Sequence, residues 1–131
     1  MPKTTLMYLK LKHPERPFVL HVFVSEPSAA ISRRLNRYKT KRSSFESDYF
    51  DLQINEDACV FDLEDTLPAH YVMIFPKKPF IGDIVHESFH AVAKHFHYIG
   101  TPLSIQTEEQ YAYFISWIVE SIDRWLKAAK S

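Results

Sequence analysis

Apolar and polar positions partly alternate in two runs near the start of the chain, over residues 4–12 and 18–25. Between them stands His13-Pro14-Glu15-Arg16-Pro17, in which two prolines bound a short polar turn. A period of two is typical of β-strands, and proline favours a turn over a continued strand. The pattern therefore predicts a hairpin, followed by a short helix over residues 25–38 with Pro27 near its first turn.

Further short apolar runs occupy the middle of the chain. Residues 49–54 and 58–63 flank Asn55-Glu56-Asp57, which is typical of a second hairpin. Residues 70–75 then form another apolar run that stops at Pro76, with Pro79 close behind. Because proline donates no backbone hydrogen bond, we expect this strand to end there.

The apolar period changes to that of a helix in the last third of the chain. One helix is predicted from near Pro79 to Gly100, and a second from about 107 to 129. On a helical wheel the first presents a core-facing stripe of Ile81, Val85, Phe89, Val92, Phe96 and Ile99. In the second the apolar positions are Tyr111, Phe114, Ile115, Ile118, Ile122 and Leu126. We therefore expect an α+β fold in which N-terminal strands and one short helix precede two long C-terminal helices that pack together.

Composition limits the possible classes of protein. With 131 residues, 46% of them hydrophobic, the chain fits a single domain over residues 1–131. The single cysteine, the lack of a signal-like N-terminal run and the lack of an apolar stretch long enough to span a bilayer favour a cytoplasmic protein away from the membrane. Sixteen basic residues balance sixteen acidic ones, which argues against nucleic acid as a partner.

The candidate chemistry lies in His86-Glu87-Ser88-Phe89-His90, a His-Glu-x-x-His motif within the first predicted long helix. Two histidines four residues apart share one helix face, so both imidazoles can bind one metal ion. Glu87 lies further round the helix, where it can take a proton from a water molecule bound to that metal. The alternative interpretation is a pair of partly exposed histidines that bind no metal.

A catalytic zinc ion usually has three protein ligands. His97 is about 10 Å along the helix from His90, too far to share the ion. A carboxylate at the start of the second long helix is the remaining source, and both Glu108 and Glu109 stand there. The helical wheel aligns Glu108 with the residues that face the helix pair, whereas acids in a first turn also stabilise a helix without any metal.

The motif, the eighteen residues that follow it and then Glu109 resemble the gluzincin arrangement of zinc metallopeptidases. The run Glu109-Gln110-Tyr111-Ala112-Tyr113-Phe114 is also similar to the sequence around the third ligand in zincin aminopeptidases. The resemblance covers about residues 70–126. It implies a zincin-like fold in which His86, His90 and Glu109 bind Zn²⁺ and Glu87 activates water to hydrolyse a peptide or protein substrate.

The resemblance implies two further features. Zincins often stabilise the developing oxyanion with a tyrosine or histidine, a role that we assign to Tyr111, with Tyr113, His70 and His97 as the alternatives. The strand over residues 70–75 resembles the edge strand on which zincins bind an extended substrate.

Two interpretations from other classes stay open. The first is a zinc-binding protein of zincin fold that acts as a non-catalytic interaction or inhibitory module. The second is a small nucleic-acid-binding protein that uses the basic patch, although a solvated helix face and a flexible loop are the favoured explanation of that patch. The patch consists of Arg33, Arg34, Arg37, Lys39, Lys41 and Arg42.

Overall fold

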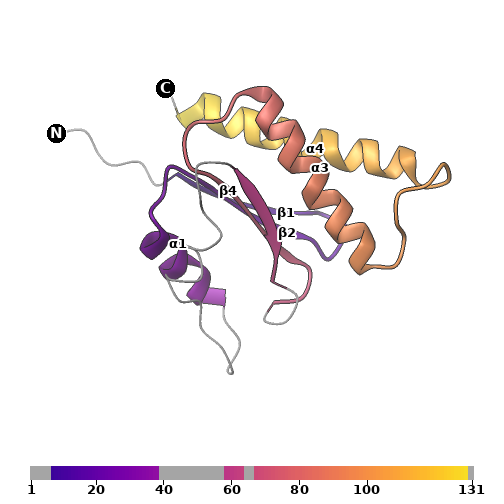
Figure 1. The fold of residues 1–131 in the computed structure, drawn as a ribbon, viewed down its shortest axis with the longest axis horizontal. Coiled ribbons are helices and arrows are strands. Elements are labelled where there is room, and N and C mark those ends of the chain that lie inside the picture. Colours follow the sequence, from indigo (N-terminus) through magenta and orange to yellow (C-terminus); the bar gives the residue numbers. More distant parts are fainter. Residues whose placement is uncertain (1–6, 39–57, 64–66, 130–131) are drawn as a thin grey trace.

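The computed structural model describes residues 7–38, 58–63 and 67–129, which form an α+β fold with a four-stranded mixed sheet (Figure 1). The described elements are β1 (Tyr8–Lys12), β2 (Val19–Val24), α1 (Ser28–Leu35), a 3-10 turn (Asn36–Tyr38), β3 (Cys59–Asp62), β4 (His70–Phe75), α3 (Ile81–Tyr98) and α4 (Glu108–Ala129). The predicted α+β class and its two long C-terminal helices are therefore confirmed.

The sheet has the strand order β1-β2-β4-β3. β1 and β2 form the predicted antiparallel hairpin, whereas β2 runs parallel to β4 and β3 runs antiparallel to β4. The second predicted hairpin is only partly testable, because residues 49–54 lie outside the described residues. Its other half is β3, and the partner that the structure gives β3 is β4.

The prediction that residues 70–75 form an edge strand was wrong. β4 is hydrogen-bonded on both sides, to β2 and to β3, and five of its six residues are buried. The run Tyr71-Val72-Met73-Ile74-Phe75 is continuously apolar, which is typical of an interior strand covered on both faces. Among the described strands, β3 is the outermost on that side of β4, and its residues are all partly exposed.

Helices cover both faces of the sheet, with α3 and α4 side by side on one face and α1 on the other (Figure 1). On the α3/α4 face, Leu20, Val22 and Met73 pack into a core with apolar residues of both helices. On the α1 face, Phe23, Val72 and Ile74 pack against Ile31 and Leu35. The alternation of strand side chains between the two faces therefore builds two cores.

The ends of α3 are set by local hydrogen bonds. At its start the Phe80 N–H donates to the Asp83 carboxylate over 2.8 Å. At its end Gly100 has φ +79°, and the Thr101 N–H donates to the Phe96 carbonyl over 2.8 Å. This left-handed C-cap suits glycine, which has no Cβ to clash. The predicted stop at Gly100 is therefore confirmed.

The predicted core-facing stripe of α3 was largely wrong. Val92 and Phe96 are buried, but four large apolar side chains at the start of the helix are exposed: Phe80 by 81%, Ile81 by 57%, Val85 by 45% and Phe89 by 42%. We call these four residues the apolar row. Phe80 was not part of the predicted stripe, and the one remaining predicted position, Ile99, is 37% exposed.

A different face of α3 is buried because it carries small and hydrogen-bonded side chains. Ser88 and Ala91 are fully buried, and their small size lets the helix lie close to the sheet. His95 is also fully buried, where it hydrogen-bonds to the Tyr71 hydroxyl over 3.0 Å and packs against the Phe18 ring. Aromatic rings from the sheet thus fill the space that large helix side chains would otherwise need.

The predicted apolar face of α4 is confirmed, with five of its six residues buried and Ile115 partly buried: Tyr111, Phe114, Ile118, Ile122 and Leu126. The start of α4 lies beside the end of α3, since the Tyr111 and Phe96 ring centroids are 4.2 Å apart. The two helices are therefore antiparallel neighbours. Within the described residues, neither is long and apolar enough to cross a membrane.

Candidate metal centre

His86 and His90 lie on the exposed side of α3, one turn apart. Their Nε2 atoms are 3.2 Å apart and their ring centroids 4.8 Å apart. The His86 side chain is 67% exposed. The motif thus brings together two ring nitrogens on exposed histidines of one helix face.

The separation of the two nitrogens suits a shared zinc ion. Zinc–nitrogen bonds of about 2.0–2.1 Å in a tetrahedral site place two ligating nitrogens roughly 3.3–3.4 Å apart. The 3.2 Å between the Nε2 atoms of His86 and His90 is close to that edge length. The two imidazoles therefore fit two corners of a zinc tetrahedron with little movement.

Glu87 lies beside this pair but is turned towards the protein. Its side chain is only 9% exposed, and its Oε2 atom is 3.8 Å from the His86 Nε2 atom. It is also close enough to Cys59 on β3 to help raise the pKa of that thiol to about 11, although burial is the larger cause. A carboxylate between the histidines and the sheet edge can accept a proton from a water molecule held near His86.

An open cavity of about 450 Å³ adjoins the motif. It is lined by Ala58, Gly82, Asp83, His86 and Glu87. Ala58 directly precedes β3, so the cavity lies between the first turns of α3 and the edge strand. This volume falls within the usual range for small-ligand sites.

Neither candidate for the third ligand lies with the histidine pair. Glu108 and Glu109 are exposed at the first turn of α4, which packs beside the far end of α3. Phe96, the contact of Tyr111, is six residues after His90, or about 9 Å along the helix. Among residues 7–38, 58–63 and 67–129, no three His, Cys, Asp or Glu side chains form a group that could hold a metal ion.

The predicted oxyanion donor Tyr111 is also at the far end of α3. It is 4% exposed and packed against Phe96, and burial raises its pKa. Tyr113 and His97 are exposed near the same end. His70 lies on the α1 face of the sheet, where its Nδ1 atom is 2.9 Å from the His21 Nε2 atom. The structure therefore brings none of the four candidates to the histidine pair.

Two buried polar groups on α3 escaped the sequence analysis. The Ser88 hydroxyl and the His95 Nε2 atom are buried without a hydrogen-bond partner in the described part of the chain. Burial, with smaller contributions from Arg16 and His13, lowers the pKa of His95 to about 4. The signal that could have found His95 is its seven-residue spacing from Ser88, which places both on one helix face.

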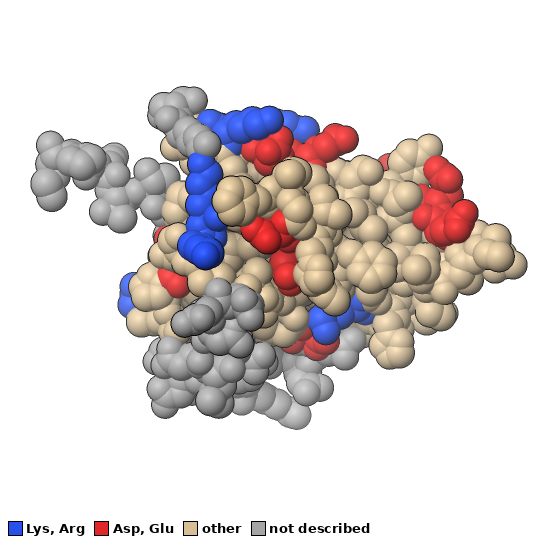
Figure 2. All heavy atoms as spheres, turned by 45° about the horizontal axis from the view of Figure 1, so that its top comes forward, with Lys and Arg blue, Asp and Glu red and all other residues tan. Residues whose placement is uncertain are grey.

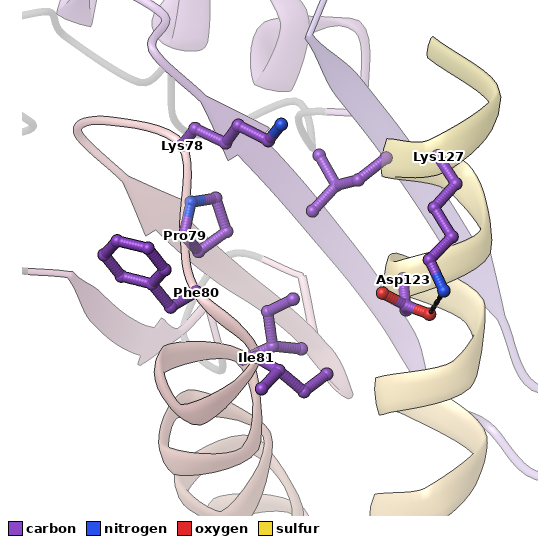
Figure 3. Close-up of a pocket in the computed structure, with 8 residues that line it drawn as sticks. Lys78, Pro79, Phe80, Ile81, Asp123 and Lys127 are labelled. Atoms are coloured by element: carbon purple, nitrogen blue, oxygen red, sulfur yellow. Dashed lines mark ion pairs between the residues drawn. The ribbon is translucent and has the colours of Figure 1, made fainter. Parts of the chain in front are cut away.

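A second cavity, of about 500 Å³, lies where the start of α3 meets the end of α4 (Figure 3). Phe80 and Ile81 of the apolar row line it, together with Leu126. At its α4 side Lys127 forms a 2.9 Å ion pair with Asp123. None of the predicted site residues lines this cavity, so it is separate from the histidine pair.

Comparisons of the chain with protein-family models, with curated proteins and with solved structures found no match.

Proposed function

We propose that the protein is a zinc metallopeptidase of zincin-like fold. The observation that carries the proposal is the 3.2 Å separation of the His86 and His90 Nε2 atoms, with the Glu87 carboxylate 3.8 Å from the first of them. Two metal ligands and a base in one helical turn supply part of the arrangement used in metal-assisted hydrolysis, to which a third protein ligand is usually added.

Zinc held by the two histidines would polarise the scissile carbonyl and make a water molecule acidic near neutral pH. Glu87 accepts a proton from the attacking water as the oxygen bonds to the carbonyl carbon. It then delivers that proton to the amine nitrogen as the carbon–nitrogen bond breaks. The products are a carboxylic acid and an amine, and Glu87 returns to its starting state.

The surroundings of Glu87 support this role. Its side chain is almost buried, so the carboxylate is held in place beside His86 while the histidines stay exposed to a substrate. β3 begins next to the cavity at the motif, which Ala58 lines directly before the strand.

The third protein ligand stays a prediction. Glu109 is the residue that the spacing favours, but the structure keeps it apart from the histidines. The proposal therefore rests on the pair and the base, and Glu109→Ala measures directly whether that carboxylate contributes to zinc affinity.

The deciding experiment compares zinc content and peptide hydrolysis in wild type, Glu87→Gln and a matched control, Glu120→Gln, which changes an exposed glutamate on α4. Glu87→Gln should keep its zinc and lose about 10²–10⁴-fold in hydrolysis of a peptide library, because a general base contributes on that order. Glu120→Gln should behave as wild type. Zinc binding without hydrolysis in the wild type would favour the non-catalytic zinc-binding module.

A further inference from the structure

The exposed side of α3 carries three kinds of side chain in separate bands. His86 and His90 form the middle band. With 100° per residue, Asp83 and Lys94 lie about 50° to one side, while Val85 and Phe89 of the apolar row lie roughly 100° to the other side. On the face of the molecule that carries the helices, uncharged side chains separate small groups of acidic and basic side chains, some of which lie in the middle of the face (Figure 2).

We propose that two copies of the chain dimerise through α3, with one Zn²⁺ ion held between the histidine pairs of the two copies. The inference rests on the proposed zinc site and concerns its regulation. His86 and His90 fit two corners of a zinc tetrahedron, and the other two corners face solvent because the side chains are exposed. A second copy related by a two-fold axis supplies an identical pair for those corners.

The charged band fits a copy that runs antiparallel. Position 88 is midway between the two histidines, and Asp83 stands five residues before it while Lys94 stands six residues after it. These offsets are about 8 Å and 9 Å along the axis. A two-fold axis at position 88 therefore brings Asp83 of each chain opposite Lys94 of the other. A parallel arrangement would instead place like charges at the same level.

The apolar band lies outside the contact. Val85 and Phe89 are about 100° round the helix from the histidines, so in the dimer they lie along one margin and do not face the second copy. A contact with two-fold symmetry is isologous, so the Asp83–Lys94 pairing occurs twice. The charged band therefore selects the antiparallel orientation.

The exposed area indicates that the dimer needs the metal. Even if all four side chains of the apolar row faced the second copy, their exposed fractions would offer only roughly 450 Å² per chain, taking about 200 Å² for a large apolar side chain. A stable interface buries about 800 Å² per partner. The apolar row alone is therefore too small to hold two copies together, and zinc bridging supplies the remainder.

The dimer would be a latent form of the proposed enzyme. With four histidines around the ion, no coordination position is left for water or substrate, and the second copy covers the surface beside Glu87. A catalytic zinc ion needs such an open position. Dissociation to a single chain restores it, so the state of association sets the activity.

The test is the molar mass of metal-free protein by light scattering at zinc-to-chain ratios of 0, 0.5 and 10, with bound zinc measured in each species. We expect a single chain without zinc and a dimer with one ion per two chains at 0.5. At 10 we expect single chains again, since each histidine pair can then bind its own ion. His86→Ala and His90→Ala should stay single chains at every ratio.

Two outcomes would overturn the dimer. A single chain that binds one zinc at every ratio would remove the dimer and leave the proposed function standing, whereas a chain that binds no zinc would remove both.

Substitutions at the flanks check the orientation. Lys94→Glu should lower the association constant of the zinc-dependent dimer at least tenfold, because the new carboxylate would lie opposite the Asp83 carboxylate of the second copy. The matched control Lys12→Glu makes the same change on β1 and should leave dimerisation unchanged. Asp83→Lys combined with Lys94→Glu should restore it. Equal dimerisation of Lys94→Glu and Lys12→Glu would refute the antiparallel arrangement.

Discussion

Because His95 is buried, the free energy of unfolding should decrease as the pH is lowered. It is fully buried, and burial lowers its pKa from 6.5 to about 4 in the folded protein. A histidine whose folded pKa is depressed contributes fully above its unfolded pKa, and that contribution is lost as the pH falls towards the folded value. Each pH unit in this window costs about 1.4 kcal/mol.

The loss from His95 between pH 7 and pH 5 is therefore about 2 kcal/mol, a large share of a typical stability of 5–15 kcal/mol. Urea denaturation followed by the fluorescence of Trp117 and Trp125 measures it. His95→Leu should lose about 2 kcal/mol less over this interval than wild type, whatever its stability at pH 7. The control His97→Leu, at an exposed position of the same helix, should lose as much as wild type.

The result that would refute this reasoning is an equal loss of unfolding free energy between pH 7 and pH 5 in wild type and His95→Leu. It would mean that His95 does not stay neutral in the folded core. His21, also fully buried and with its pKa lowered to about 3, would add a separate loss over the same range that the His95→Leu comparison cancels.

Two further predictions concern packing and reactivity. Ala91→Leu should destabilise the protein by about 1–3 kcal/mol in urea denaturation, because Ala91 is fully buried where α3 meets the sheet. The control Ala112→Leu, at an exposed position of α4, should change the free energy of unfolding by less than about 0.5 kcal/mol. Equal effects of the two substitutions would contradict the buried face that the structure gives α3. Cys59 should react with a thiol reagent at pH 8 on the order of 100-fold more slowly in folded than in urea-unfolded protein, because its raised pKa of about 11 leaves little thiolate. Equal reaction rates in the two states would contradict the raised pKa.

The elements of the fold were predictable where the local pattern determines them. The β1–β2 hairpin, the end of α3 at Gly100 and the buried face of α4 all follow from alternation, capping and a 3.6-residue period. The order of the strands was not predictable in this way. β4 was expected at an edge, but pairing with β2 and β3 depends on contacts between segments far apart in sequence.

The face that α3 buries was mispredicted for a physical reason. A stripe of large apolar residues usually marks the core side of a helix, but here Ser88, Ala91 and His95 are the buried ones. The Tyr71 hydroxyl makes burial of His95 possible by hydrogen-bonding to its Nδ1 atom. A wheel of one helix cannot show a partner on the sheet, so tertiary contacts overrode the local pattern.

The candidate site was predictable as far as one helix defines it. The four-residue spacing of His86 and His90 places their nitrogens together, and the place of Glu87 next to His86 in sequence puts it further round the helix. The position of Glu109 depends instead on how α4 packs against α3. Because Tyr111 packs beside Phe96, the start of α4 is held at the far end of α3 from the motif.

The most direct test of the central claim is the zinc content of protein that has been stripped of metal, incubated with zinc and freed of unbound ion. We expect wild type and Glu87→Gln to retain zinc, and His86→Ala and His90→Ala to retain none. The claim would be contradicted if wild type retained no zinc, or if it and the two histidine variants retained the same amount.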